Sequence, residues 1–123
     1  MAENNKKPCI LVVDDQPKLL RFIEIRLKLS DFEVIGATSG EKALELARTA
    51  SPDIMLLDII LPGMDGFEVL KELRCFSQMP VIVFSASPSN CHDAIQMGAN
   101  YFMPKPFNPD EMVCKIRQFL GIK

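Results

Sequence analysis

Short apolar runs alternate with longer segments of helical period along the chain, and this alternation limits the fold more than any other feature. The apolar runs have the length of buried strands, and they lie at residues 9–13, 32–37, 53–58, 80–84 and 101–103. The segments between and after them bring apolar residues back every three or four positions, which predicts helices at about 17–30, 38–50, 65–76, 89–97 and 108–120. We therefore predict an α/β fold of right-handed βαβ units, with a five-stranded parallel sheet covered by helices on both faces.

Capping signals mark three of the predicted helix starts. Thr38 with Glu41, and Asp65 with Glu68, have the spacing of capping boxes, in which two side chains satisfy each other's backbone N–H groups. Asn108 stands before a proline and two acidic residues, the order that a helix start prefers. These local signals support the helical segments independently of the apolar periodicity.

Length and composition fit one globular domain. The chain has 123 residues, of which 48% are hydrophobic and 24% charged, and these values argue against a disordered or fibrous protein. We expect one folded unit at residues 8–121, preceded by a tail at 1–7 and followed by two end residues at 122–123.

The charge balance and the apolar runs exclude two classes of partner. Fourteen Lys and Arg against sixteen Asp and Glu leave a net charge of -2, which disfavours direct binding to nucleic acid. The apolar runs are all far shorter than the roughly 18 residues that a membrane-spanning helix needs, and the first residues lack the apolar core of a signal peptide. We therefore predict a cytoplasmic protein without a membrane partner.

The cysteines and the single histidine do not form a recognisable metal or redox motif. Cys9, Cys75, Cys91 and Cys114 are too widely spaced for the short pairs that bind zinc or exchange thiols. Cys9 opens an apolar run and Cys114 lies on a helical stripe, so we expect buried, reduced thiols without a disulfide. His92 is the only histidine, and we expect it at the surface or in helix packing.

The residues that follow four of the predicted strands form a distinctive set. They are Asp14 and Asp15 after the first strand, Asp58 at the end of the third, Ser85 and Ala86 at the end of the fourth, and Lys105 after the fifth. In an open parallel sheet, ligands bind beyond the carboxyl ends of the strands, near the point where the strand order reverses. The sequence therefore predicts that these residues converge at one edge of the sheet.

The charges of this set predict a cation and a reaction. Three adjacent carboxylates repel one another unless positive charge intervenes, and a divalent cation together with Lys105 gives approximate neutrality. Oxygen ligands select Mg²⁺ or Mn²⁺ rather than zinc. A carboxylate held in this way can attack a phosphoryl group, and Asp58 is the best nucleophile because it is single, central and followed by the Pro62-Gly63 turn.

In sequence order, the same regions carry a recurring set of motifs. They are Val12-Val13-Asp14-Asp15, Leu57-Asp58 with Leu61-Pro62-Gly63-Met64-Asp65-Gly66, Val83-Phe84-Ser85-Ala86, and Gly98-Ala99 leading to Lys105-Pro106-Phe107. With these motifs the chain resembles the receiver domain of two-component response regulators over residues 8–121. The resemblance implies a doubly wound, flavodoxin-like fold with strand order 2-1-3-4-5.

The resemblance also implies roles for the residues around Asp58. Asp58 would accept a phosphoryl group from a phosphohistidine on a sensor kinase or a histidine phosphotransfer protein. Asp15 and Asp58 would bind Mg²⁺ directly, Asp14 would act through water, and the backbone carbonyl of Ile60 would complete the protein ligands. The implied protein is a signalling switch rather than a turnover enzyme, with self-catalysed phosphoryl transfer and autodephosphorylation only.

A second group of roles follows from the same resemblance. The Ser85 hydroxyl, the Ala86 backbone amide and the Lys105 ammonium would hold the phosphoryl oxygens. The Lys105-Pro106 peptide bond is expected to be cis. Phosphorylation would draw the Ser85 hydroxyl inward, and Phe102 would follow as the switch aromatic. If the predicted register were wrong by one residue, Tyr101 would take that role instead.

Two features depart from the family pattern. Pro104 removes a backbone donor, so the last strand should lie at the sheet edge or end there. The segment from Ser85 to Gly98 is about two residues shorter than in typical receivers, so the helix within it should be short or shifted. Since that helix contributes to the usual output face, the downstream protein or fused output domain stays open, as do a homodimer and the choice between a stand-alone regulator and an excised domain.

Three other functions compete with phosphoryl acceptance. A flavodoxin-like electron carrier has the same layers, but the acidic loop after the first strand would repel a flavin phosphate. A haloacid-dehalogenase-type phosphatase carries its nucleophile in an Asp-x-Asp pattern after the first strand, which this chain lacks. A receiver-like scaffold that binds partners without phosphorylation is the third alternative.

Overall fold

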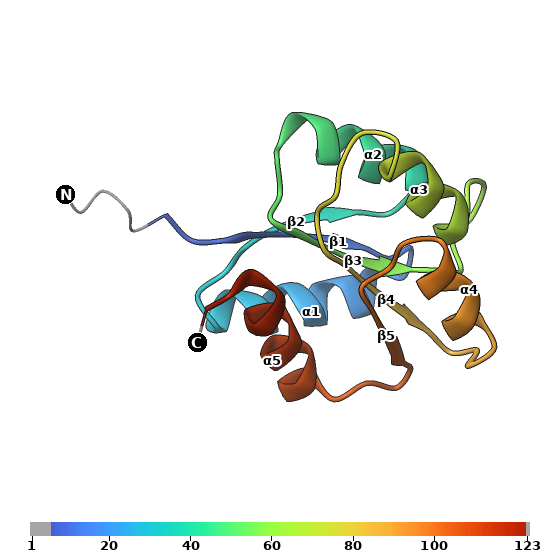
Figure 1. The fold of residues 1–123 in the computed structure, drawn as a ribbon. Coiled ribbons are helices and arrows are strands. Elements are labelled where there is room, and N and C mark those ends of the chain that lie inside the picture. Colours follow the sequence, from blue (N-terminus) through green and yellow to red (C-terminus); the bar gives the residue numbers. More distant parts are fainter. Residues whose placement is uncertain (1–5, 123) are drawn as a thin grey trace.

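The computed structural model describes residues 6–122 and places a twisted sheet between two layers of helices (Figure 1). The strands within these residues are β1 Cys9–Val13, β2 Glu33–Ala37, β3 Ile54–Asp58, β4 Val81–Ser85 and β5 Tyr101–Pro104. The helices are α1 Pro17–Leu29, α2 Gly40–Thr49, α3 Gly66–Leu73, α4 Asn90–Gln96 and α5 Pro109–Leu120. The strand order is β2-β1-β3-β4-β5 and every pairing is parallel, which confirms the predicted fold class and order.

The predicted domain limits are only partly covered by the structure. Residues 1–5 of the predicted tail and Lys123 lie outside the described residues. Within the described part, no helix combines the length and the apolar character that a membrane crossing requires. The boundaries at residues 8 and 121 remain a prediction.

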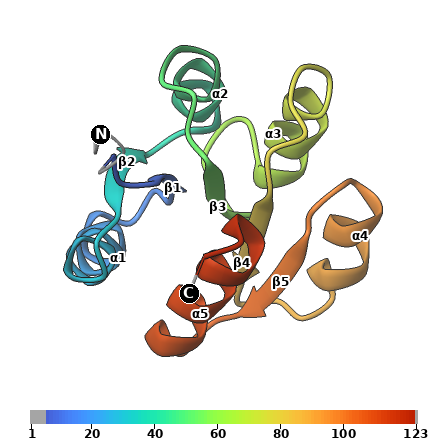
Figure 2. The same ribbon diagram turned by 60° about the vertical axis from the view of Figure 1, so that its left-hand side comes forward.

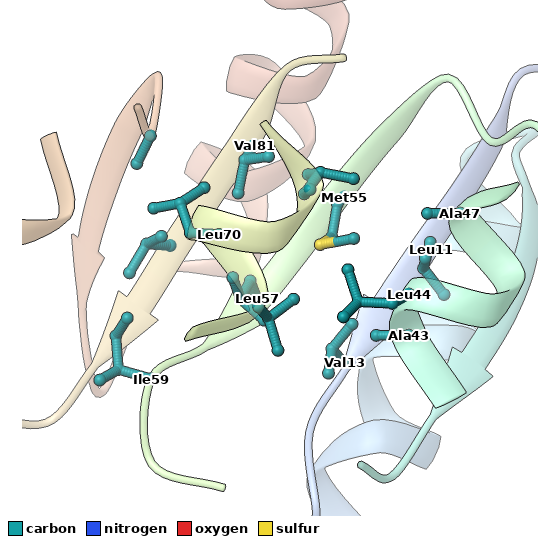
Figure 3. Packing of buried hydrophobic residues seen from close by; sticks show 14 of the residues in the cluster. Leu11, Val13, Ala43, Leu44, Ala47, Met55, Leu57, Ile59, Leu70 and Val81 are labelled. Atoms are coloured by element: carbon teal, nitrogen blue, oxygen red, sulfur yellow. The ribbon is translucent and has the colours of Figure 1, made fainter. Parts of the chain in front are cut away.

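Helices α2, α3 and α4 lie on one face of the sheet, and α1 and α5 lie on the other (Figure 2). The strand register aligns side chains of the same face: Leu11 pairs with Met55, and Met55 with Val81. Figure 3 shows these side chains packed against Leu44 of α2 and Leu70 of α3. Because alternate strand residues face opposite layers, a sheet covered on both faces needs apolar residues at nearly every strand position, as the sequence has.

The capping signals are confirmed at two helix starts and wrong at the third. Asp65 and Glu68 form the capping box of α3, and Asn108 accepts from the backbone N–H of Asp110 at the start of α5. Helix α2, however, begins one residue later than Thr38 predicts, with Ser39 as its N-cap.

The start of α2 is determined by packing rather than by the capping pattern. Gly40 lies against α3, since a Cβ there would come within 2.7 Å of Val69 Cγ2 and 3.0 Å of the Met64 carbonyl oxygen. This close approach places the glycine at the first helical position. The Ser39 hydroxyl therefore accepts from the Lys42 N–H, over 3.2 Å.

The expectation of buried thiols is wrong for three of the four cysteines. All four are free, but Cys75, Cys91 and Cys114 are exposed and Cys9 is half-buried. On α5, Val113 and Ile116 face the sheet, which turns the intervening Cys114 outward. Cys114 therefore lies outside the apolar face of that helix.

The two departures from the family pattern have structural counterparts. Helix α4 has seven residues, from Asn90 to Gln96. Strand β5 lies at the edge of the sheet and ends at Pro104, after which the Lys105 backbone N–H donates to the Ser85 carbonyl over 2.9 Å. The sheet edge therefore tolerates the missing backbone N–H of Pro104, because the next residue donates its own N–H to β4.

Candidate functional site

Three carboxylates converge at the carboxyl end of the sheet. Asp14 and Asp15 follow β1 and Asp58 ends β3, and these two strands are adjacent. One carboxylate oxygen from each of the three lies within 4.8 Å of the others. Asp14 and Asp58 are buried, whereas Asp15 is exposed to solvent. The predicted convergence of the acidic residues is therefore present.

A cavity of about 320 Å³ opens at this cluster. Its lining consists of Asp15, Gln16, Asp58, Ile60, Ala86 and Lys105. The sequence analysis did not include Gln16. A signal for it exists in the sequence, because a residue two places after an aspartate commonly donates its backbone N–H to that carboxylate. The cavity gives small molecules access to Asp58, whose own surface is almost wholly buried.

Lys105 places its ammonium group between the two buried carboxylates. Its Nζ donates to Asp58 Oδ2 over 3.0 Å and lies 3.5 Å from Asp14 Oδ2. The same Nζ stands 5.1 Å from the centre of the Phe84 ring. The Lys105-Pro106 peptide bond is cis. Lys105 is therefore the positive charge that the structure itself supplies to the acidic cluster.

Asp14 remains incompletely satisfied despite this lysine. The Gln16 backbone N–H donates to Asp14 Oδ1 over 2.7 Å, while Oδ2 is fully buried and no described residue donates a hydrogen bond to it. Burial raises the pKa of Asp14, and the nearby charges of Asp58 and Asp15 raise it further. The Gln16 N–H and Lys105 lower that pKa, but not enough to reverse the direction. The acidic cluster thus carries more negative charge than Lys105 alone offsets.

The residues present fit a hard divalent cation. Their ligand atoms are carboxylate oxygens, which Mg²⁺ and Mn²⁺ prefer, and neither a thiolate nor an imidazole belongs to the cluster. The buried Asp14 oxygen without a donor is a group that positive charge would satisfy. The cluster can therefore hold the cation that its charges predict.

Asp58 is held in place by the connection between β3 and α3. The Ile60 backbone N–H donates to Asp58 Oδ1 over 3.1 Å, so each Asp58 oxygen has one donor. The Gly66 N–H donates to the Ile59 carbonyl over 2.8 Å. A Cβ at Gly66 would lie 2.6 Å from the Asp58 carbonyl oxygen, so α3 can begin this close to β3 only with glycine.

Ser85 lies at the predicted strand end, but its hydroxyl is held by the connection that follows β4. It is fully buried at the end of β4, and it is not among the residues that line the cavity. Its hydroxyl oxygen accepts from the Ser87 backbone N–H over 3.1 Å and from Asn90 Nδ2 over 2.9 Å. Ala86, by contrast, does line the cavity. The sequence analysis missed Asn90, because no local pattern predicts a side-chain contact across this short connection.

The two aromatics of β5 face opposite layers. Phe102 pairs with Val83 of β4 and packs, half-buried, against the core on the side of α2, α3 and α4. Tyr101 faces the other layer, where its hydroxyl donates to Glu111 over 2.9 Å. The strand register thus places Phe102 on the same side of the sheet as α4.

A second, mainly apolar groove of about 460 Å³ adjoins the site. It shares Ala86 and Lys105 with the cavity and extends over α1 and the segment after β5; its other lining residues are Leu19, Phe22, Pro106 and Phe107. Phe22 is exposed over 50% of its surface. An apolar surface therefore borders the cavity that gives access to Asp58.

The family model described as the response regulator receiver domain matches residues 10–117. Among curated proteins, the chain is 39% identical over 118 residues to the probable transcriptional regulator ycf27 of Porphyra purpurea, and 38% identical over 119 residues to the alkaline phosphatase synthesis transcriptional regulatory protein PhoP of Bacillus subtilis. Each match covers 94% of this chain and 49% of the relative, so the chain spans about half the length of these relatives.

Solved structures agree with these matches. The receiver domain of the Francisella response regulator 1452 superposes with a TM-score of 0.89 at 30% identity, covering 94% of this chain and 98% of that one. The BeF3-activated N-terminal receiver domain of Klebsiella pneumoniae RstA gives a TM-score of 0.87 at 31% identity, covering 91% of this chain and 97% of that one. The fold and the sequence therefore point to one family.

Proposed function

The chain belongs to the response regulator receiver family, and on that basis we propose that it is a switch that accepts a phosphoryl group on Asp58 and then changes the surface it offers to a partner. The observation that carries this proposal is the environment of Asp58. It is a buried carboxylate that ends β3, borders an open cavity, and lies 3.0 Å from the ammonium of Lys105.

A divalent cation completes the proposed site. Asp15 and Asp58 would hold Mg²⁺ or Mn²⁺ directly, Asp14 would act through water, and the Ile60 carbonyl would complete the protein ligands. When bound, the cation supplies positive charge that offsets the charge of the carboxylates and of the transferred group. Asp14 Oδ2 supports this role, because it is buried and accepts no hydrogen bond from the residues that the structure describes.

The proposed transfer uses residues that already stand at the cavity. An Asp58 oxygen attacks phosphorus, a new O–P bond forms, and the N–P bond of the phosphohistidine breaks with its electron pair left on the imidazole. Lys105 and the Ala86 backbone N–H would hold the phosphoryl oxygens, together with the Ser85 hydroxyl once it turns toward them. The same site would catalyse its own dephosphorylation, without turnover of any other substrate.

The proposed phosphodonor is a histidine kinase or a histidine phosphotransfer protein. The apolar groove that adjoins Asp58 gives such a protein a surface to bury while its phosphohistidine reaches the cavity. Because the relatives named as transcriptional regulators are about twice as long as the matched segment, we propose that the switch passes its state to a fused output domain or to a separate protein. A cytoplasmic location is part of the same proposal.

The test is phosphorylation by a small donor. Purified protein incubated with acetyl phosphate and Mg²⁺ should gain the mass of one phosphoryl group in intact-mass spectrometry, and a chelator should prevent the gain. Asp58→Asn should gain nothing, while Asp31→Asn, a matched change at an exposed carboxylate, should behave as wild type. A wild-type protein without mass gain would favour the scaffold that binds partners without phosphorylation.

A further inference from the structure

The buried hydroxyl of Ser85 is held from the side of α4. Its oxygen accepts from the Ser87 backbone N–H and from the side-chain amide of Asn90, over 3.1 Å and 2.9 Å. A hydroxyl oxygen has two acceptor positions, so both are filled, and only its proton stays free to donate. Ser85 is fully buried, so water does not compete for these bonds.

Apart from the bond between Asn90 and Ser85, few side-chain contacts fix the start of helix α4. Its seven residues bury only Ala94, and its N-cap Ser89 makes no capping bond with its side chain. The Ser89 hydroxyl pairs instead with the Ser87 hydroxyl over 2.9 Å. Among residues 6–122, the bond from Asn90 to Ser85 is the hydrogen bond that joins a side chain of α4 to β4. The first turn of α4 is therefore tied to the end of the strand by one amide.

The held orientation of Ser85 conflicts with the role proposed for its hydroxyl. The cavity that exposes Asp58 is lined by Ala86 and Lys105 but not by Ser85. A turn of the Ser85 side chain to another staggered rotamer carries its oxygen away from donors that are placed for the present one. Asn90 then either loses its acceptor or moves with it, together with the first turn of α4.

We propose that Asn90 is a positioning residue that holds the Ser85 hydroxyl in its resting orientation and couples its release to the start of α4. This inference rests on the proposed function, since the competing partner of the hydroxyl is a phosphoryl group on Asp58. The coupling is reciprocal: the bond from Asn90 opposes capture of the phosphoryl group, and capture releases or displaces the first turn of α4. Asn90 acts only through Ser85 and does not touch the phosphoryl group.

The first experiment measures binding of a phosphoryl mimic, BeF₃⁻ in the presence of Mg²⁺, by titration followed with amide NMR. Asn90→Ala should bind BeF₃⁻ about 2- to 10-fold more tightly than wild type, the range that the loss of one hydrogen bond between neutral groups gives. Cys91→Ala, an exposed neighbour on the same helix, should leave the affinity unchanged. The affinity for Mg²⁺ alone should not change in either variant, because Asn90 does not reach the carboxylates.

The second experiment separates coupling through Ser85 from a general effect on α4. In a Ser85→Ala background, Asn90→Ala should no longer change BeF₃⁻ affinity. Amide hydrogen exchange of residues 90–96 should speed up when wild type binds BeF₃⁻, and in Asn90→Ala it should be fast from the start. If Asn90→Ala fails to fold, Asn90→Leu, which keeps the bulk without the donor, replaces it.

The outcomes distinguish the two proposals. If wild type binds BeF₃⁻ but Asn90→Ala binds it equally or more weakly, the coupling is overturned and the proposed function stands. An effect of Asn90→Ala that persists without the Ser85 hydroxyl also overturns the coupling. If wild type itself does not bind BeF₃⁻ with Mg²⁺, the proposed function fails, and the inference fails with it.

Discussion

Asp14 and Ser85 occupy equivalent places in the sheet but meet opposite conditions. Each is a fully buried polar side chain at the carboxyl end of a strand, β1 for Asp14 and β4 for Ser85. The Ser85 hydroxyl accepts two hydrogen bonds from its own connection, whereas Asp14 Oδ2 accepts none from residues 6–122 and has only the ion pair with Lys105. The site therefore has two halves. In the hydroxyl half, at Ser85, the described residues satisfy the polar group; in the acidic half, at Asp14, Asp15 and Asp58, they do not.

This difference indicates how the two halves can respond to a ligand. The acidic half is unfavourable as it stands, because buried negative charge exceeds the positive charge of Lys105, so added positive charge should stabilise the fold. The hydrogen bonds of the Ser85 hydroxyl are already made, so a ligand that binds this hydroxyl must first break them. Five measurements of stability can break or sharpen this comparison, and they follow in order of decreasing effect.

Removal of the positive charge from the acidic half should have the largest effect. Lys105→Met leaves Asp14 and Asp58 buried without their shared cation, and we expect it to lower the free energy of unfolding by about 2 kcal/mol in denaturant titrations without Mg²⁺. Lys42→Met, at an exposed ion pair with Glu45, should cost less than about 0.5 kcal/mol. Equal losses in the two variants would contradict the comparison.

Removal of the negative charge from Asp14 should have the opposite sign. Asp14→Asn should raise the free energy of unfolding near neutral pH and without Mg²⁺ by about 1.5 kcal/mol, because a buried charge without a full set of partners disappears. The control is Asp31→Asn, whose carboxylate is exposed and whose stability should match wild type. A destabilised Asp14→Asn protein would show that the acidic half is already balanced.

The pH dependence of the Asp14 effect has a defined sign. The pKa of Asp14 lies above its ordinary value of 3.8 in the folded state, so the folded protein binds this proton more tightly than the unfolded chain does. Wild-type stability should therefore fall, through this group, as pH rises from 3.8 through the raised pKa. The advantage of Asp14→Asn should grow as pH rises over that window and should be smallest and constant below it.

Binding of Mg²⁺ should stabilise the wild-type protein by mass action. At a free Mg²⁺ concentration tenfold above the dissociation constant, the free energy of unfolding should rise by about 1.4 kcal/mol. Thermal melts with and without Mg²⁺ measure this rise. Asp15→Asn should reduce it, since Asp15 is the exposed member of the acidic cluster, and Ser85→Ala should not. Loss of the rise in Ser85→Ala would show that the two halves of the site are not independent.

Disruption of the hydroxyl half should have the smallest effect. Ser85→Ala leaves the Ser87 N–H and the Asn90 amide without their acceptor, and we expect a loss of about 1 kcal/mol that Mg²⁺ does not restore. Ser89→Ala removes an exposed hydroxyl pair from the same connection and should cost less than about 0.5 kcal/mol. A stabilised Ser85→Ala protein would mean that the hydroxyl is not satisfied at rest.

The sequence by itself was sufficient for the parallel sheet and for the convergence of the acidic residues with Lys105, while the strand order came from the resemblance to receiver domains. The reason is that strand and helix periodicity, and caps such as Asp65 with Glu68, depend on residues only a few positions apart. Once the strands are parallel, their carboxyl ends must meet at one edge, wherever they lie along the chain. The positions of Asp14, Asp58 and Lys105 follow from that topology.

Only the tertiary structure decided which polar groups at that edge are satisfied. The unpartnered oxygen of Asp14, the amide of Asn90 on Ser85 and the outward turn of Cys114 depend on how loops and helices pack against the sheet. The start of α2 at Gly40 instead of after Thr38 depends on its close approach to α3. Hydrogen bonds require distances and angles that a pattern of residue types does not contain, so these features needed the coordinates.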